Sequence, residues 1–170
     1  MIIREFSFER DIDQVANLFH EVWNSNQGEF IERLERHGKY PGFYSFVAAD
    51  GFSIVGFAYG YTSTAGQYYH ERIKQALSST EQEFWMTNCF ELVELAVHPF
   101  YRRKRIGREL VTSLITQADK RTAILTTQTN NDPARTLYES LGWKIIRENF
   151  FPGESSESYI IMGLERSKNI

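Results

Sequence analysis

The most informative stretch of the chain is residues 94–110, ELAVHPFYRRKRIGREL. It begins as an apolar run that ends near Val97, which is typical of a buried strand. From Ile106 onward, apolar residues recur at the spacing of an amphipathic helix. Consecutive cations, Arg102 to Arg105, lie between the two. The stretch therefore predicts a strand, a basic loop and a helix.

The start of that helix is suited to an anion. The first N–H groups of a helix have no intrahelical partner and carry the positive end of its dipole. Gly107 has no side chain to keep a ligand from the backbone, and Arg108 adds a cation. Charge and position alone leave open both a phosphate or pyrophosphate site and a solvated basic surface. Cations here oppose the dipole, so their placement is unfavourable unless an anion compensates.

Length and composition restrict the domain organisation and the partners. The chain has 170 residues, which predicts one domain spanning 1–170. Its net charge of −3 argues against a nucleic-acid partner. Its charged start is unlike a signal peptide, and no stretch approaches the roughly 18 apolar residues of a membrane span. Since a single cysteine suits a reducing compartment, we expect a cytoplasmic protein without membrane association.

Strands and helices alternate along the rest of the chain in a pattern typical of an α/β fold. Expected strands are 2–6, 43–49, 53–61, 88–97, 123–129, 143–149 and 158–164, with a hairpin turn at Asp50-Gly51. Expected helices begin at Asp11 as N-cap, cover 27–37 and 106–120, run from Asp132-Pro133 to Gly142, and include a short one near 68–77. Hairpins mixed with crossover helices predict a mixed sheet with helices on both faces.

The segment Val97–Gly107 resembles the acetyl-CoA signature V-x-P-x-x-R/Q-x-x-G-x-G/A of the GNAT superfamily of N-acetyltransferases. Arg102 takes the R/Q position and Gly107 the last small position, whereas Arg105 stands where the family usually has glycine. A second block, Asn131–Trp143, resembles the family's N-x-x-A-x-x-L-Y-x-x-x-G-F/W pattern.

The resemblance implies a fold, a reaction and a set of cofactor-binding residues. The fold is a central mixed, mostly antiparallel sheet of six to seven strands with helices on both faces. The reaction is transfer of acetyl from acetyl-CoA to a primary amine by direct attack in a ternary complex, without a metal, in a protein that could form a homodimer. The implied acetyl-CoA contacts are Leu95, Ala96, Val97, Arg102, Arg103, Lys104, Arg105, Ile106, Gly107, Arg108, Asn131, Ala134 and Tyr138.

Acetyl transfer also needs a base for the amine and an acid for the leaving thiolate. Tyr138 matches the family tyrosine that protonates the thiolate, although its helical position also suits core packing. Glu94 is the preferred base because apolar neighbours would raise its pKa, and Glu91 is a rival on the same strand. Asn131 could equally serve as a helix N-cap. Cys89 has no basic neighbour in sequence, so we expect an inert thiol.

The acceptor amine is not identified by the sequence. Aromatic and acidic side chains suited to a cationic amine occur near the first helices and before the central strand, although most of the aromatic ones also suit a core. They are Trp23, Phe30, Tyr59, Tyr61, Tyr68, Tyr69, Trp85, Glu29 and Glu32. Two other functions stay open: a non-catalytic acyl-CoA-binding domain of the same fold, and an anionic-surface or nucleic-acid binder using Arg102–Arg108.

Overall fold

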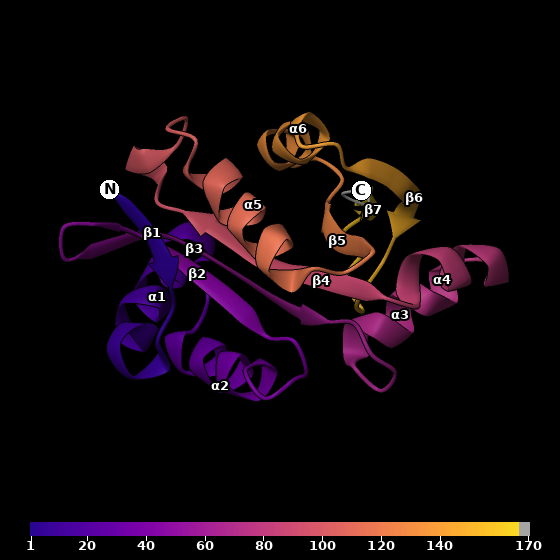
Figure 1. The fold of residues 1–170 in the computed structure, drawn as a ribbon, viewed down its shortest axis with the longest axis horizontal. Helices are drawn as coiled ribbons and strands as arrows, with labels where there is room; N and C mark the ends of the chain where they lie inside the picture. The colour runs from indigo at the N-terminus through magenta and orange to yellow at the C-terminus, as the bar shows by residue number, and fades with distance from the viewer. Residues whose placement is uncertain (167–170) are drawn as a thin grey trace. The chain divides into compact units, whose positions relative to one another are not determined.

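The computed structural model describes residues 1–166, which form a mixed α/β fold around a seven-stranded sheet (Figure 1). The strand order is β1-β2-β3-β4-β5-β7-β6. The strands are Ile2–Glu5 (β1), Tyr44–Asp50 (β2), Ser53–Thr62 (β3), Cys89–Val97 (β4), Thr122–Gln128 (β5), Lys144–Phe150 (β6) and Tyr159–Glu165 (β7). The helices are Phe8–Trp23 (α1), Gln27–His37 (α2), Tyr68–Ala76 (α3), Ser79–Met86 (α4), Ile106–Ala118 (α5) and Asp132–Ser140 (α6), with a 3₁₀ turn at Pro99–Tyr101 (η1).

The sheet is mixed, as the sequence predicts. β4 and β5 run parallel, whereas the pairs β1–β2, β2–β3, β5–β7 and β6–β7 are antiparallel. Two parallel strands cannot be joined by a tight turn and need a longer crossover. Helix α5 provides that crossover between β4 and β5. The expected fold class is therefore confirmed.

Two compact units make up the described part of the chain. The first comprises Met1–Tyr61 and Leu92–Ala118, and the second comprises Thr62–Glu91 and the residues from Asp119 onward. Strand β4 contributes residues to both units. One domain spanning 1–170 stays a prediction.

In the first unit, β2 and β3 carry helices on both of their faces (Figure 1). Val47 and Phe57 pair across the two strands and are buried in the core that α1 and α2 complete. The next pair, Ala48 and Gly56, turns to the opposite face because side chains alternate along a strand. There a Cβ on Gly56 would lie 2.9 Å from Cγ2 of Ile106, so α5 packs directly onto the backbone of β3.

In the second unit, α3 and α4 pack on the strands. Ile73 of α3 and Met86 of α4 share a core with Ile124 of β5, Phe150 of β6 and Ile161 of β7. These five residues are buried, so the two helices and the three strands share one apolar core.

Several boundaries follow the predicted signals and one helix does not. Gly51 in the β2–β3 turn has φ 61° and Gly142 after α6 has φ 94°, both as expected of glycine in left-handed turns. Helix α4 was not predicted. It starts with a capping box in which Ser78 and Glu81 bond each other's backbone N–H groups, a signal present in the sequence but followed by few apolar residues.

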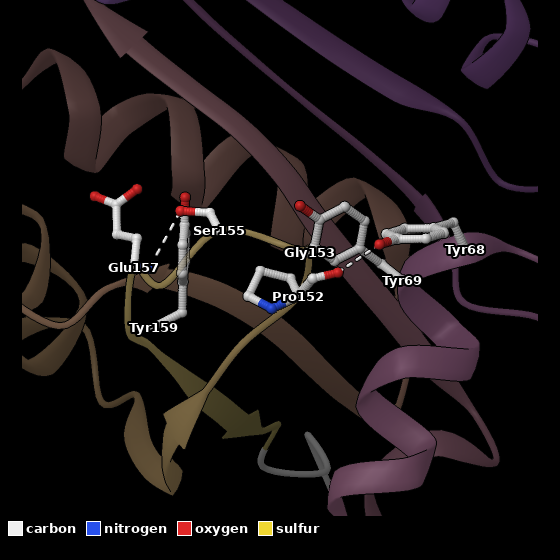
Figure 2. A pocket seen from close by; sticks show the side chains of 7 residues that line it. All are labelled: Tyr68, Tyr69, Pro152, Gly153, Ser155, Glu157 and Tyr159. Atoms are coloured by element: carbon white, nitrogen blue, oxygen red, sulfur yellow. Dashed lines mark hydrogen bonds between the residues drawn. The ribbon is translucent and has the colours of Figure 1, made fainter.

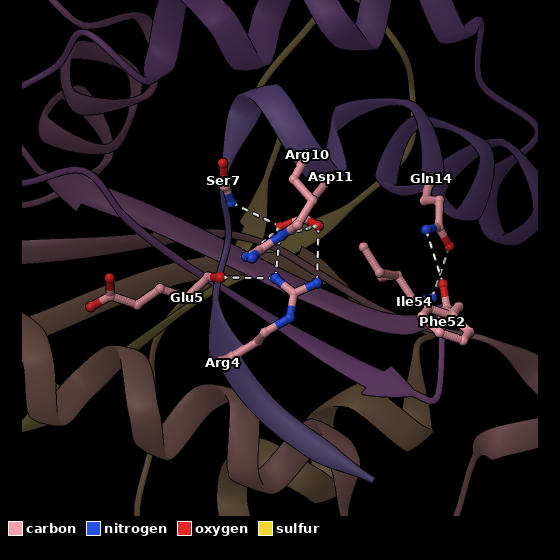
Figure 3. A network of polar contacts seen from close by, with 8 residues as sticks. All are labelled: Arg4, Glu5, Ser7, Arg10, Asp11, Gln14, Phe52 and Ile54. Carbon is pink, nitrogen blue, oxygen red and sulfur yellow. Dashed lines mark hydrogen bonds and ion pairs between the residues drawn. The ribbon is translucent and has the colours of Figure 1, made fainter.

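The prediction of Asp11 as an N-cap is wrong, because α1 begins at Phe8 with Ser7 as its N-cap. Asp11 is instead buried within the first turn, and its carboxylate accepts the backbone N–H of Ser7 at 2.9 Å. Arg4 of β1 donates to both of its oxygens, at 2.8 and 3.0 Å, and Arg10 donates at 3.2 Å (Figure 3). Asp11 thus ties α1 to β1 through a bidentate ion pair.

The same helix is tied to the β2–β3 turn by one further side chain. Gln14 donates to the carbonyl of Phe52 and accepts the N–H of Ile54, both at 3.1 Å (Figure 3).

Over residues 1–166, no helix has the length and apolar character needed to cross a membrane.

We predict that Asp11→Asn destabilises the protein by about 2 kcal/mol at pH 7, because Arg4 and Arg10 lose a buried anionic partner. Burial alone would raise the pKa of Asp11, but the hydrogen bonds from Arg4, Ser7 and Arg10 outweigh it and hold the pKa well below its usual range. This stabilisation is therefore complete above about pH 4 and is lost as the carboxylate protonates in stronger acid.

Urea unfolding at pH 7 and pH 3 measures this effect, with the exposed neighbour Asp13→Asn as the matched control. Asp11→Asn should lose stability at pH 7 and differ less from the unsubstituted protein in acid. Equal stabilities of the two variants at pH 7 would contradict the role of Asp11.

Candidate active site

Two residues of the basic loop before α5 have a left-handed backbone conformation. Arg103 has φ 64° and Arg105 has φ 66°, in the region that favours glycine. Arg105 therefore occupies the position where the family pattern has glycine while keeping the backbone shape that glycine would allow. Both arginines are exposed and, within residues 1–166, neither pairs with a carboxylate.

The first turn of α5 presents backbone N–H groups at the end of that loop. The first intrahelical bond is donated by Glu109 to the carbonyl of Arg105, at 3.1 Å, so the N–H groups of residues 106–108 precede the hydrogen-bond ladder. Gly107 is half-buried and has no Cβ to cover them. The side chain of Ile106 is buried against Gly56, so only its backbone can contact a ligand.

Neighbouring contacts anchor the loop. Tyr101 of η1 donates to Asp50 at 2.8 Å, and the ammonium group of Lys104 lies 5.1 Å from the centroid of the Tyr101 ring. His98 is fixed by Glu21 at 3.1 Å and by the Phe100 N–H, which donates to Nδ1 at 3.2 Å. A tethered loop with exposed cations, followed by a helix start at which Gly107 has no side chain, fits the pyrophosphate of acetyl-CoA.

Glu94 lies on β4 in the first unit, with 23% of its side-chain surface exposed. Burial raises the pKa of this carboxyl to about 7, although Arg33 acts in the opposite direction. Arg33 Nη2 lies 3.5 Å from Oε1 of Glu94, and its guanidinium is 5.6 Å from the ring centroids of both Phe19 and Phe30. A carboxyl with a pKa near 7 can accept a proton at physiological pH.

Arg33 was not singled out by the sequence analysis. It lies on α2, 61 positions from Glu94, and only the folded chain brings the two side chains together. The Phe19 and Phe30 rings that it contacts stack on each other, and no local sequence pattern links Arg33 to Glu94.

The remaining strand positions near Glu94 offer backbone groups. Ala96 is buried, while Leu95 and Val97 are half-buried next to it. The rival carboxylate Glu91 is 4% exposed and belongs to the second unit, where it pairs with Ile124 of β5.

In the second unit, Asn131 is the N-cap of α6. Its Oδ1 accepts the N–H of Ala134 at 3.2 Å, so the capping interpretation of Asn131 holds and its Nδ2 is the atom that could reach a ligand. Tyr138 is 5% exposed, its ring centroid is 5.8 Å from that of Trp143, and its carbonyl accepts the N–H of Trp143. Tyr138 therefore also packs, as its helical position predicted.

The other reactive groups have structural surroundings. Cys89 is buried, and burial raises the pKa of its thiol to about 12, which agrees with the expected inert thiol. Of the aromatic residues considered for the acceptor, Phe30, Tyr59 and Tyr61 are core residues, and Tyr59 bonds to buried His37 at 2.9 Å. Tyr68, in contrast, is 58% exposed.

Comparisons with known proteins show which family the sequence resembles. The sequence model of the acetyltransferase (GNAT) family matches residues 11–143. The [ribosomal protein bS18]-alanine N-acetyltransferase of Escherichia coli is 40% identical over 79 residues, which cover 43% of this chain and 53% of that protein. The match thus spans about half the length of the curated relative.

Solved structures show the same fold. The crystal structure of the Escherichia coli ribosomal-protein-S18-alanine N-acetyltransferase superposes with a TM-score of 0.69, at 20% identity, over 99% of this chain and 97% of that one. That of yncA from Salmonella typhimurium, solved with its cofactor acetyl-CoA, gives 0.70 at 15% identity, over 99% and 95%. Because the family model covers most of the chain, and includes both the basic loop and the Asn131–Trp143 block, the protein belongs to the acetyltransferase (GNAT) family.

Proposed function

We propose that the protein is an acetyl-CoA-dependent N-acetyltransferase that acts on a primary amine of a small molecule or a peptide. The observation that carries the proposal is the basic loop: the cations of residues 102–105, two of which (Arg103 and Arg105) have a left-handed backbone, lead directly into the first turn of α5. Arg103 and Arg105 form no ion pair with a carboxylate within residues 1–166, although they lie at the positive end of the helix dipole. A bound pyrophosphate would compensate these charges, which supports the proposal.

Both backbone groups and side chains would contact acetyl-CoA. The N–H groups of Ile106, Gly107 and Arg108 would bond the pyrophosphate, with Arg102, Arg103, Lys104 and Arg105 adding charge. The backbone of Leu95, Ala96 and Val97 would contact the pantetheine arm, as would Asn131 and the segment around Ala134. When bound, acetyl-CoA supplies an activated thioester carbonyl.

Glu94 is proposed as the general base. The attacking amine must lose a proton as its nitrogen bonds the carbonyl carbon, and a carboxylate with a pKa of about 7 can take that proton directly or through water. Arg33 would keep part of the Glu94 population ionised near neutral pH because its charge favours the carboxylate. Glu91 remains the alternative base.

Tyr138 is proposed as the acid that protonates the coenzyme sulfur when the carbon–sulfur bond breaks. A phenol with an ordinary pKa of about 10 and a thiol with one of about 8.5 are close enough for efficient proton transfer. Its place in the Asn131–Trp143 block, which the family model matches, supports this role.

We also propose a cytoplasmic setting and leave a homodimer as a prediction. The single cysteine, Cys89, is a free buried thiol, which suits a reducing compartment.

The bS18 N-acetyltransferase relative acts on an alanine of a ribosomal protein, which favours a protein amine among the possible acceptors.

We predict that saturating acetyl-CoA raises the melting temperature. At 100 times its Kd it would add about 2.7 kcal/mol, which corresponds to roughly 5–10 °C for a domain of this size. Differential scanning fluorimetry measures the shift, with ATP as the phosphate control. A shift with acetyl-CoA but no turnover on a broad amine panel would favour the non-catalytic acyl-CoA-binding domain. Absence of any shift would contradict the cofactor site.

Arg105 provides a matched pair of variants. Both Arg105→Ala and Arg105→Gly remove the guanidinium, so both should weaken acetyl-CoA binding by a similar, several-fold amount. Only glycine relieves the left-handed backbone at φ 66°, so Arg105→Gly should be about 1 kcal/mol more stable than Arg105→Ala. Calorimetric binding and urea unfolding separate the two effects. If Arg105→Gly proved the less stable variant, the loop would not hold this backbone shape.

Glu94→Gln should lower kcat/KM by two orders of magnitude or more, about what a general base contributes. In the unsubstituted enzyme the rate should fall as pH drops through about 7, because protonated Glu94 cannot accept the amine proton. Arg33→Met should move that limb to higher pH, since the charge that lowers the pKa of Glu94 is lost. Glu91→Gln tests the alternative base in the same assay, and unchanged turnover of Glu94→Gln from pH 6 to 9 would exclude Glu94 as the base.

The pH dependence of the free energy of unfolding tests the raised pKa of Glu94 independently of activity. Because the pKa of Glu94 is raised on folding, the unsubstituted protein should lose stability as pH rises from about 4.5 to 7. Glu94→Gln removes this loss and should be the more stable protein at pH 8, which urea unfolding can measure. A less stable Glu94→Gln at pH 8 would show that the ionised carboxylate is well compensated.

A further inference from the structure

His98 lies in the first unit, between the end of β4 and the 3₁₀ turn η1 that leads into the basic loop. The two nitrogens of its ring have different partners. Nδ1 accepts the backbone N–H of Phe100 at 3.2 Å, so the side chain caps η1. Nε2 lies 3.1 Å from Oε2 of Glu21, near the end of α1. The ring therefore connects α1 to the turn that precedes the basic loop.

These two contacts determine which ring nitrogen carries the proton. An ionised carboxylate only accepts hydrogen bonds, so the nitrogen beside Glu21 is the protonated one. A nitrogen that accepts an N–H must keep its lone pair, so Nδ1 is unprotonated. Neutral imidazole with its proton on Nε2 meets both conditions. Glu21 thus selects the tautomer of His98 whose Nδ1 can cap the turn.

Backbone hydrogen bonds fix the position of the capped turn. The N–H of His98 donates to the carbonyl of Val55 on β3, and the N–H of Tyr101 donates to the carbonyl of His98, both at 2.8 Å. Arg102 follows Tyr101 directly and is the first cation of the basic loop. The conformation of η1 therefore sets the direction in which the basic loop leaves β4.

A second proton on the ring would break one of the two side-chain contacts and keep the other. Imidazolium donates from both nitrogens, so Nδ1 could no longer accept the N–H of Phe100. Nε2 would keep its contact with Glu21, now as a charged pair. The added positive charge would by itself favour an anion, but Glu21 offsets it. Loss of the cap is therefore the change that affects the basic loop.

The other titratable and charged groups around the ring come from η1, the β2–β3 turn and the basic loop. The Tyr101 ring centroid lies 6.0 Å from that of His98, and the Tyr101 hydroxyl donates to Asp50. This bond raises the pKa of Tyr101, so its hydroxyl stays protonated. Lys104 lies over the Tyr101 ring. Histidine is the side chain that ordinarily changes charge between pH 5 and 8, so His98 is the group of this cluster suited to respond to mild acid.

We propose that His98 is a pH-sensitive positioning residue for the acetyl-CoA site: neutral His98 caps the turn that places the basic loop, and protonated His98 releases it. The proposal deepens the proposed function and rests on it in one respect, because acetyl-CoA is the proposed ligand of the basic loop. It adds a control of affinity by pH. This control is separate from the proton transfer proposed for Glu94, which acts in turnover rather than in binding.

Two substitutions each keep one of the two contacts, and neither introduces a group that titrates. In His98→Asn, Oδ1 can replace Nδ1 as the acceptor for the N–H of Phe100, as asparagine before proline does in turns. In His98→Gln, the longer side chain can reach Glu21 but does not cap the turn. At pH 8, His98→Asn should bind acetyl-CoA as the unsubstituted protein does, and His98→Gln should bind about two- to fivefold more weakly, as expected of a lost cap.

Isothermal titration calorimetry with acetyl-CoA at pH 8.0 and 5.5, at constant ionic strength, measures the affinity without turnover. The phosphate monoester of acetyl-CoA and Glu94 also gain protons in this range, so the comparison is between proteins at the same pH. Between pH 8.0 and 5.5, the unsubstituted protein should lose about two- to fivefold more affinity than His98→Asn, whose cap does not titrate.

NMR of the ring nitrogens in the ligand-free protein tests the protonation of His98 directly. At pH 8.0 the signals should show a proton on Nε2 and a free lone pair on Nδ1, and at pH 5.5 they should show protons on both. A proton on Nδ1 at pH 8.0, or a ring that is still neutral at pH 5.5, would overturn the proposal.

Two calorimetric results would also overturn it: the same pH dependence in the unsubstituted protein and His98→Asn, or equal affinities of the two variants at pH 8.0. If acetyl-CoA binds all three proteins with one pH dependence, the role of His98 is wrong and the proposed function stands. If acetyl-CoA binds none of them at pH 8.0, the proposed function itself is wrong, and the control by His98 falls with it.

Discussion

Close packing of the first turn of α5 on β3 is the constraint on which the candidate cofactor site depends. A Cβ at Gly56 would lie 2.9 Å from Ile106 and 3.1 Å from Leu110, so only glycine lets the helix lie this close to the strand. Buried Ile106 thereby fixes the helix at the residue where the basic loop ends. The N–H groups that would hold a pyrophosphate are positioned by apolar packing, while the cations around them are exposed and contribute charge rather than structure.

Two carboxylates of the first unit show how surroundings decide function. Asp11 is buried with two arginines and a backbone N–H as partners, which lowers its pKa and makes it a structural anion. Glu94 has one cation at 3.5 Å and dense protein around it, so burial dominates and its pKa rises to about 7. The first carboxylate stabilises the fold at neutral pH. The second has a pKa close to neutral pH and can both accept and release a proton there, which is the property a general base needs.

Local patterns predicted the elements that carry strong signals. The strand, basic loop and helix of residues 94–110 were predictable because apolar periodicity and a run of cations coincide, and Gly51 and Gly142 marked their turns. The sequence misled at Asp11, because an acidic residue in a first turn can cap or pair, and its partner Arg4 precedes the helix on another element. The ion pair of Arg33 with Glu94 and the hydrogen bond of Tyr68 with Pro152 (Figure 2) depend on contacts between residues far apart in the sequence, which no local pattern encodes.

The first turn of α5 and the basic loop are the proposed binding site for the pyrophosphate of acetyl-CoA. Backbone amide NMR during an acetyl-CoA titration tests this binding residue by residue. The signal of an N–H group that gains a hydrogen bond to a phosphate oxygen should shift strongly. We expect the largest shifts at the amides of Ile106, Gly107 and Arg108, and much smaller ones with acetylated pantetheine, which lacks the pyrophosphate. Saturable binding of acetyl-CoA without a shift of these three amide signals would rule out this pyrophosphate site.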